Sequence, residues 1–229
     1  MRAWPNSTMF YIVESGFPEK LEKKIRDAIE TINNLNIVKL VEVIGDDYAE
    51  VGQSVFIYKN RGCSSHIGWN QDDTEESGGG LIRISQDCST GVIIHEILHA
   101  LGFIHEQVNP SSNLIFNYSR IAYNEDQFIN KDAVALTTYD SKSIMHYSSN
   151  DFSICNYPDN YAWVDFLGKD LPDKSCKGSS HWTSIESGVN CPVECAVFSL
   201  PGGEIIEKQR NSLSALDILG LRSLYPLNN

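Results

Sequence analysis

The chain has 229 residues, enough for one large core or for two lobes that share a cleft. Hydrophobic residues make up 41% and charged residues 21%, as in soluble globular proteins, and no apolar run approaches the roughly 20 residues that span a bilayer. The net charge of -12 repels phosphate backbones and therefore disfavours binding to nucleic acid.

Strands and two helices are predicted for the N-terminal half of the chain. The strands are expected at residues 10–13, 37–44, 54–58 and 81–84. A helix is expected from Glu19 to Leu35, because apolar residues recur on one face and Pro18 precedes it. A second, apolar helix is expected from Gly91 to Leu101, with Ser89-Thr90 at its start and Gly102 at its end.

Regular structure becomes sparse after Gly102. A short helix is expected at residues 119–129 and a final helix at residues 213–225. Residues 154–197 are rich in Cys, Pro, Gly and Ser and have little periodicity, so they are expected to form an irregular insertion. We therefore predict an α+β fold in a single domain, residues 1–229, with an ordered N-terminal lobe (1–102) and a loop-rich C-terminal lobe (103–229).

The six cysteines are even in number and include no C-x-x-C pair, which favours disulfides over a zinc knuckle. Disulfides indicate an oxidising compartment, so a secreted, extracellular protein is expected. Six unpaired cytosolic thiols remain the alternative. The first residues, Met1 to Pro5, do not begin a signal peptide. This favours a mature domain whose leader has been removed, or a chain with an added Met.

One stretch combines three histidines with a glutamate, at residues 95–106. Residues i and i+4 of a helix lie on one face about 5–6 Å apart, so His95 and His99 can bind one ion. Gly102 allows a sharp turn after which His105 can return as a third ligand. Glu96 can project toward water on the metal and act as general base. Three histidines with an open position indicate a catalytic zinc site with one Zn²⁺.

The spacing H-E-x-x-H-x-x-G-x-x-H is the metzincin signature, and Ser143-Ile144-Met145-His146-Tyr147 resembles the Met-turn of those enzymes. Glu106 after the third histidine and the S-I-M-H-Y sequence make the chain similar to the astacin family. The likeness extends over nearly the whole chain except residues 154–197. It includes further matching segments: Trp4-Pro5, residues 62–68, Tyr139-Asp140 and residues 213–217.

The resemblance implies roles for individual residues. Met145 would lie beneath the zinc as an apolar floor, and Tyr147 would be a fifth zinc ligand that moves to stabilise the transition state. Glu106 would be a buried carboxylate that anchors the N-terminal region. Cys63 and Cys88 would form a disulfide beside the upper rim of the cleft. The strand near Gly62 to His66 would be that rim and would pair with an extended substrate.

The resemblance also implies a metzincin-like, two-lobed catalytic domain. Its N-terminal lobe would contain a twisted mixed sheet plus helices, its C-terminal lobe would be irregular, and zinc would lie in the cleft between them. The expected activity is that of a zinc-dependent endopeptidase that acts on proteins or peptides. An N-terminal propeptide in a zymogen, a monomeric state, and the absence of a nucleic-acid partner or a membrane span are expected.

Two other interpretations of the sequence remain open. The chain could be a non-enzymatic binding module in which zinc is structural, although such a site needs neither Glu96 nor Tyr147. It could also be a metzincin of another family, which Glu106 and the Met-turn sequence disfavour. Hydrolysis of denatured casein, together with zinc content, separates an enzyme from a binding module.

The insertion contains the remaining four cysteines: Cys155, Cys176, Cys191 and Cys195. A long segment with little periodicity buries little apolar surface and needs crosslinks. If the resemblance pairs Cys63 with Cys88, these four pair among themselves, in a connectivity that sequence does not determine. The insertion would either limit which substrates enter the primed side of the cleft or be a surface excursion.

Overall fold

A computed structural model of the chain describes residues 3–44, 53–69, 80–118, 121, 128, 134–149, 151, 196–206 and 211–226. The chain divides into two compact units. The first is Met1–Ile104, Lys142–Met145 and Arg210–Asn229, and the second is His105–Ser141 and His146–Gln209. No helix among the described residues is long and apolar enough to cross a membrane. The predicted lobes that meet at residues 102–103, and the cleft between them, stay predictions.

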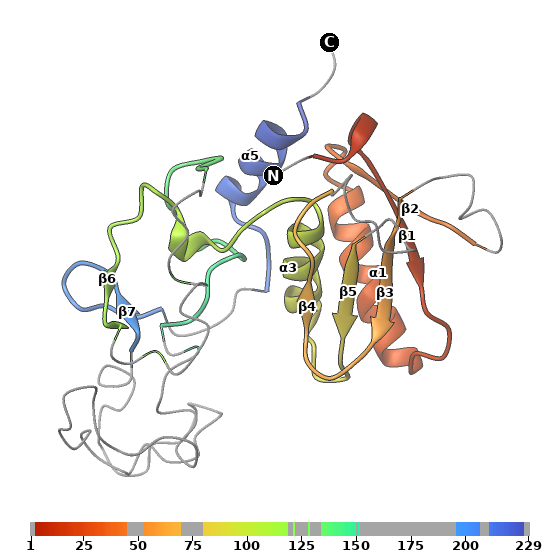
Figure 1. Cartoon of the computed structure of the whole chain (residues 1–229), viewed down its shortest axis with the longest axis horizontal. Helices are drawn as coiled ribbons and strands as arrows, with labels where there is room; N and C mark the ends of the chain where they lie inside the picture. The colour runs from red at the N-terminus through yellow and green to blue at the C-terminus, as the bar shows by residue number, and fades with distance from the viewer. Residues whose placement is uncertain are drawn as a thin grey trace. The chain divides into compact units, whose positions relative to one another are not determined.

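A five-stranded sheet forms the body of the first unit, with spatial order β2-β1-β3-β5-β4 (Figure 1). Strands β2, β1, β3 and β5 are parallel, and β4 pairs antiparallel with β5, so the predicted mixed sheet is confirmed. Strand β4 therefore lies at one edge of the sheet. The bounds of the strands are β1 Thr8–Val13, β2 Lys39–Glu42, β3 Val55–Lys59, β4 Ser64–Ser65 and β5 Leu81–Ile84.

Helices α1 (Glu19–Asn33) and α3 (Thr90–Ala100) pack against each other and against the sheet (Figure 1). Buried residues alternate along the strands, as Val55 and Ile57 do on β3, so they share one face of the sheet. The buried residues of α1 fall on one helical stripe: Leu21, Ile25, Ala28, Ile29 and Ile32. The apolar face and the apolar stripe together form the core of this unit.

Apart from the helix predicted at residues 119–129, the helices and strands predicted from periodicity are present, with small differences at their ends. The strand expected at residues 37–44 is shorter, because only Lys39–Glu42 pair with β1. The final helix, α5 (Ala215–Leu224), begins later than expected because Ser214 caps it. A 3-10 turn, η1 (Pro5–Ser7), precedes β1. Turns this short leave no periodic signal in the sequence.

The second unit has short elements around a small apolar cluster. A 3-10 turn, η3 (Glu106–Val108), is followed by strand β6 (Ile115–Phe116), which pairs antiparallel with β7 (Phe198–Ser199). The cluster consists of buried side chains: Ile121, Phe128, Val197, Phe198 and Ile206. Nearly all of the helix predicted at residues 119–129 and of the insertion at residues 154–197 lies outside the described residues. The four cysteines of the insertion are among the residues not described.

Candidate metal centre

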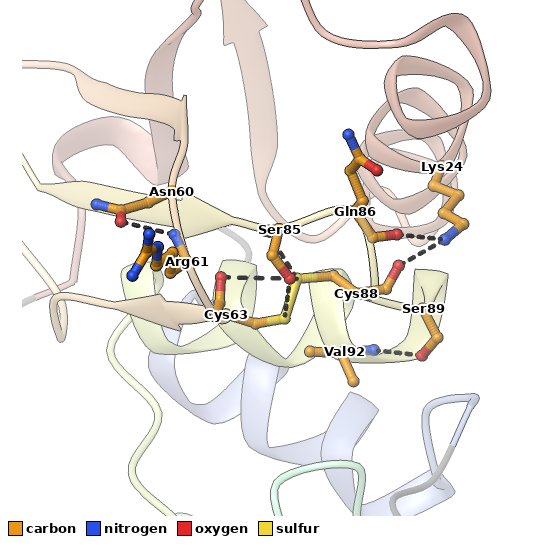
Figure 2. Close-up of a disulfide and its surroundings, with 10 residues drawn as sticks. Lys24, Asn60, Arg61, Cys63, Ser85, Gln86, Cys88, Ser89 and Val92 are labelled. Atoms are coloured by element: carbon orange, nitrogen blue, oxygen red, sulfur yellow. Dashed lines mark hydrogen bonds between the residues drawn. A yellow bond between two sulfur atoms is a disulfide. The ribbon is translucent and has the colours of Figure 1, made fainter.

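Helix α3 begins at a reinforced turn. The Ser89 hydroxyl accepts a hydrogen bond from Val92 N at 3.2 Å, which confirms the predicted N-cap (Figure 2). Just before it, a disulfide joins Cys88 to Cys63, the pair that the resemblance implies. Lys24 on α1 donates to Cys88 O at 2.7 Å, on the other side of the same turn (Figure 2). The start of α3 is thus fixed from both the sheet edge and α1.

The other end of α3 turns sharply at Gly102, as the sequence predicts. Gly102 has φ +110°, which a residue with a side chain rarely adopts. Gly102 N donates to His99 O at 2.8 Å and Phe103 N donates to Leu98 O at 2.9 Å. These two bonds form a Schellman motif, which closes the helix and redirects the chain toward His105.

Two aromatic side chains satisfy the remaining carbonyl groups at this helix end. Trp4 Nε1 donates to Ala100 O at 2.7 Å, and the Tyr225 hydroxyl donates to Leu101 O at 2.8 Å. Trp4 N in turn donates to the Tyr225 hydroxyl at 3.3 Å. Both side chains are buried, and burial raises the pKa of Tyr225, so its phenol remains a donor. Residues near both ends of the chain therefore hold the end of α3.

His95 and His99 are both buried side chains of α3, with their rings edge to face and the ring centroids 4.6 Å apart. Since a carbonyl oxygen only accepts, His95 Nδ1 donates to Ile144 O and His99 Nδ1 donates to Phe103 O, each at 2.8 Å. Both bonds fix the tautomer and make Nε2 the nitrogen with the lone pair. Burial lowers the pKa of His95 to about 4 and that of His99 to about 3, so both rings are neutral at pH 7.

His105 completes the group predicted from the spacing. One ligand atom from each of His95, His99 and His105 lies within 4.8 Å of the others. A tetrahedral zinc with bonds of about 2.0–2.1 Å holds its ligand nitrogens about 3.4 Å apart. Neutral imidazoles whose Nδ1 atoms are hydrogen-bonded are the donors that zinc prefers. The three histidines are positioned to bind a metal ion.

Glu96 follows His95 on α3 and is only 6% exposed. Burial raises the pKa of its carboxyl group to about 8, because the charged form loses hydration. A cation held nearby favours the charged form and acts in the opposite direction. The proton affinity of Glu96 is therefore raised by burial and would be lowered by a metal ion bound at the adjacent histidines.

The Met-turn, residues 143–147, has no helix or strand and is held by side chains. Met145 is fully buried. The Asp217 carboxylate, on α5, accepts from the Ser143 hydroxyl at 2.6 Å and from Ile144 N at 3.0 Å. Ile144 O is the acceptor for the His95 ring, so one residue of the Met-turn contacts both Asp217 and a histidine of the metal group.

The last residues of the Met-turn are anchored within the second unit. Tyr147 N donates to Oε1 of the buried Gln107 at 3.3 Å, and the Tyr147 ring lies against the His105 ring, with centroids 4.0 Å apart. His146 is fully buried and donates through Nδ1 to Tyr147 O at 2.7 Å. Its Nε2 accepts from the Tyr139 hydroxyl at 2.9 Å. These contacts give His146 a structural role in this turn.

Glu106 differs from its expected environment. Its side chain is half-buried, not fully buried. Its Oε1 accepts from Asn109 Nδ2 at 2.9 Å and from Asp140 N at 2.8 Å. The carboxylate therefore ties the turn after His105 to the segment near residue 140, and its predicted role in anchoring the N-terminal region stays a prediction.

Sequence reasoning gave no role to the side chains that hold the Met-turn. Asp217 and Gln107 act through contacts with segments far away in the chain, which periodicity does not reveal. The S-x-x-D sequence from Ser214 to Asp217 is a capping-box pattern and could have located the start of α5. It carries no information about the Met-turn.

Comparison with known proteins identifies the family. The family model for astacin, a peptidase family, matches residues 1–160, more than half of the chain. The chain belongs to the astacin family. The predicted resemblance is thereby confirmed, and with it zinc as the metal that the three histidines are positioned to hold.

Individual astacin relatives are distant in sequence. Zinc metalloproteinase nas-25 of Caenorhabditis elegans is 25% identical over 236 residues, which cover 90% of this chain and 57% of that protein. Zinc metalloproteinase dpy-31 of Haemonchus contortus is 30% identical over 176 residues, which cover 73% of this chain and 30% of that protein. The chain thus spans little more than half of the first relative's length and less than a third of the second's.

A solved structure has the same fold. High choriolytic enzyme 1, a hatching enzyme zinc-protease from Oryzias latipes, aligns with a TM-score of 0.67 and 22% identity. The alignment covers 98% of this chain and 92% of that one. The predicted metzincin-like fold class is confirmed.

Proposed function

We propose that this protein is a zinc-dependent endopeptidase that hydrolyses peptide bonds of proteins. The observation that carries the proposal is the group of His95, His99 and His105 with the buried Glu96 beside it on α3. A structural zinc site is closed by four protein ligands, whereas three histidines leave a position open. The names of the astacin relatives, both zinc metalloproteinases, support the same activity.

Glu96 is the proposed general base. When bound, zinc supplies Lewis-acid chemistry that polarises the scissile carbonyl group and the attacking water. Glu96 takes a proton from that water and delivers it to the nitrogen of the leaving group. Burial prevents bulk water from competing for the carboxylate, and no covalent intermediate with the protein forms.

Tyr147 is the proposed donor to the oxyanion that develops on the scissile carbonyl, and also a fifth metal ligand before substrate binds. Its ring packs against the ring of His105, and Gln107 holds its backbone. A phenol placed beside a metal-binding histidine can hydrogen-bond a developing negative charge. Met145, fully buried in the preceding turn, is proposed as the apolar floor of the metal group.

Extended peptides are the proposed substrates, and β4 is the proposed surface that they pair with. Strand β4 ends the sheet, so its outer backbone groups face away from β5. A substrate strand could add to this edge by main-chain hydrogen bonds. Gly68 N, just beyond β4, donates to His99 O at 2.8 Å, which ties the edge to the helix that carries the metal ligands. His66 is exposed near this edge and could contact substrate.

Secretion, activation from a zymogen by removal of an N-terminal propeptide, and a monomeric state complete the proposal. The Cys63–Cys88 disulfide supports an oxidising compartment. Size-exclusion chromatography with light scattering tests the monomeric state, and a dimer at micromolar concentration would contradict it.

The proposed activity has a direct test. The purified mature protein should contain one zinc per chain and cleave denatured casein or gelatin internally. A chelator should abolish cleavage, and added zinc should restore it. Stoichiometric zinc without any proteolysis, on a broad peptide library, would favour the non-enzymatic binding module instead.

A further inference from the structure

Asp217 is a buried carboxylate, 4% exposed, at the start of α5. Its Oδ2 accepts from Ser214 N at 2.8 Å, and Ser214 Oγ accepts from Asp217 N at 2.9 Å, which is a capping box. The same carboxylate also accepts from the Ser143 hydroxyl and from Ile144 N. The capping box needs only the bonds between Asp217 and Ser214. The two further bonds, from Ser143 and Ile144 of the Met-turn, indicate another role for this carboxylate.

A continuous chain of hydrogen bonds leads from Asp217 to His95. The Ser143 hydroxyl donates its proton to Asp217 Oδ1, and its oxygen accepts from Met145 N at 3.0 Å. Met145 N and Ile144 O belong to one planar peptide group, and Ile144 O accepts from His95 Nδ1 at 2.8 Å. The orientation of that peptide group, and therefore of its carbonyl oxygen, depends on Ser143 and Asp217.

We propose that Asp217 is a positioning residue for the metal, acting through Ser143 and the 144–145 peptide group to orient the His95 ring. The inference rests on the zinc site of the proposed function and adds the residues that tune it. Each bond in the chain polarises the next, and a carboxylate at its end strengthens the acceptor that holds His95 Nδ1–H. A more strongly held Nδ1–H fixes the ring and makes Nε2 a better ligand.

Three substitutions separate positioning from helix capping. Asp217→Asn keeps the shape of the side chain but places an amide where the carboxylate accepts from three donors, the Ser143 hydroxyl, Ile144 N and Ser214 N, so it perturbs the cap as well as the Met-turn. Ser143→Ala removes the bonds to Asp217 Oδ1 and Met145 N and leaves the capping box of α5 intact. Ser214→Ala is the matched control. It removes the acceptor for Asp217 N in the capping box and leaves the bonds between Asp217 and the Met-turn in place.

The readout is the equilibrium affinity for Zn²⁺, measured by competition with a chromophoric chelator, with the thermal midpoint of the zinc-free protein recorded alongside. We expect Asp217→Asn to weaken zinc binding by roughly 10–100-fold and Ser143→Ala by about 10-fold, as for other residues that orient metal ligands. Ser214→Ala should lower the midpoint by about 2–4 °C and change zinc affinity by less than about 2-fold. The visible spectrum of the cobalt-loaded protein should shift in the first two variants only.

The proposal is overturned if Ser143→Ala binds zinc as tightly as Ser214→Ala does. Should Asp217→Asn fail to fold, Ser143→Ala decides by itself, because it leaves the cap of α5 untouched. A wild-type protein that binds no zinc would contradict the proposed function itself. A wild-type protein that binds zinc and cleaves casein, with unchanged affinity in Ser143→Ala, would contradict this inference alone.

Discussion

Helix α3 and residues 143–149 hold functional side chains in different ways. Along α3, each histidine is placed by the backbone ladder, the Ser89 cap and the Schellman motif at Gly102, so many bonds share the task. Residues 143–149 contain no helix or strand. Besides backbone bonds at Ser149, side-chain contacts hold this segment, such as those of Asp217 with Ile144 N and of Gln107 with Tyr147 N. Loss of one contact should therefore matter more in the irregular segment.

The largest expected effect is a loss of catalytic rate when Glu96 on α3 is replaced. Glu96→Gln keeps the shape of the buried side chain but removes the proton acceptor. We expect kcat to fall by roughly 10²–10⁴-fold, which is the usual contribution of a general base. Zinc content should stay at one per chain, because the three histidines are unchanged. Steady-state kinetics on a quenched peptide and metal analysis of the same sample measure both quantities.

A control distinguishes loss of the base from loss of the metal. His99→Ala removes one of the three ligands and should lose both zinc and activity. If Glu96→Gln retained a kcat near that of the wild type, another group would have to be the base. If it lost zinc as His99→Ala does, Glu96 would have a role in the metal site and not only in proton transfer.

The next largest effect belongs to the irregular segment. Tyr147→Phe preserves the ring that packs on His105 and Phe128 and removes only the hydroxyl. We expect kcat to fall by about 10²-fold, as when one oxyanion donor is removed, with a much smaller change in KM. A change confined to KM would indicate that the phenol binds substrate equally in the ground state.

Sequence reasoning predicted α3 and most of the sheet, because the residues of a helix or a strand repeat along the chain with a short, regular spacing. The spacing of His95 and His99 follows from 3.6 residues per turn, and Gly102 marks the turn that brings His105 back. The contacts of Asp217 with residues 143 and 144 join segments more than 70 residues apart, and only the folded chain brings them together. Strands β6 and β7 have two residues each, too few for an alternating pattern.

A smaller effect, on stability, tests whether the irregular segment depends on single contacts. Ser149 is fully buried, and its hydroxyl accepts from Ile206 N at 2.8 Å. Ser149→Ala leaves that buried N–H without this acceptor, so we expect the free energy of unfolding to fall by about 1–3 kcal/mol. Urea denaturation followed by fluorescence measures the change.

Ser112→Ala is the matched control for Ser149. The Ser112 hydroxyl accepts from Leu114 N at 3.2 Å, but both residues are only half-buried, so water can replace the lost acceptor. Its cost should stay within about 0.5 kcal/mol. If both substitutions lowered the free energy of unfolding equally, burial of the Ser149 contact would add nothing to its contribution to stability.

The smallest effect is expected at the start of α3, where backbone hydrogen bonds of the helix hold the functional side chains together with the cap. Ser89→Ala removes the acceptor for Val92 N and should lower the free energy of unfolding by about 1 kcal/mol. Zinc affinity should change by less than about 2-fold, because the Lys24 contact and the disulfide still hold the turn and the ligands lie further along the helix (Figure 2). Ser89→Asp, which keeps a capping oxygen, should restore the stability. If Ser89→Ala weakened zinc binding as much as Ser143→Ala, the ligands on α3 would depend on a single contact after all, and the difference between the two regions would disappear.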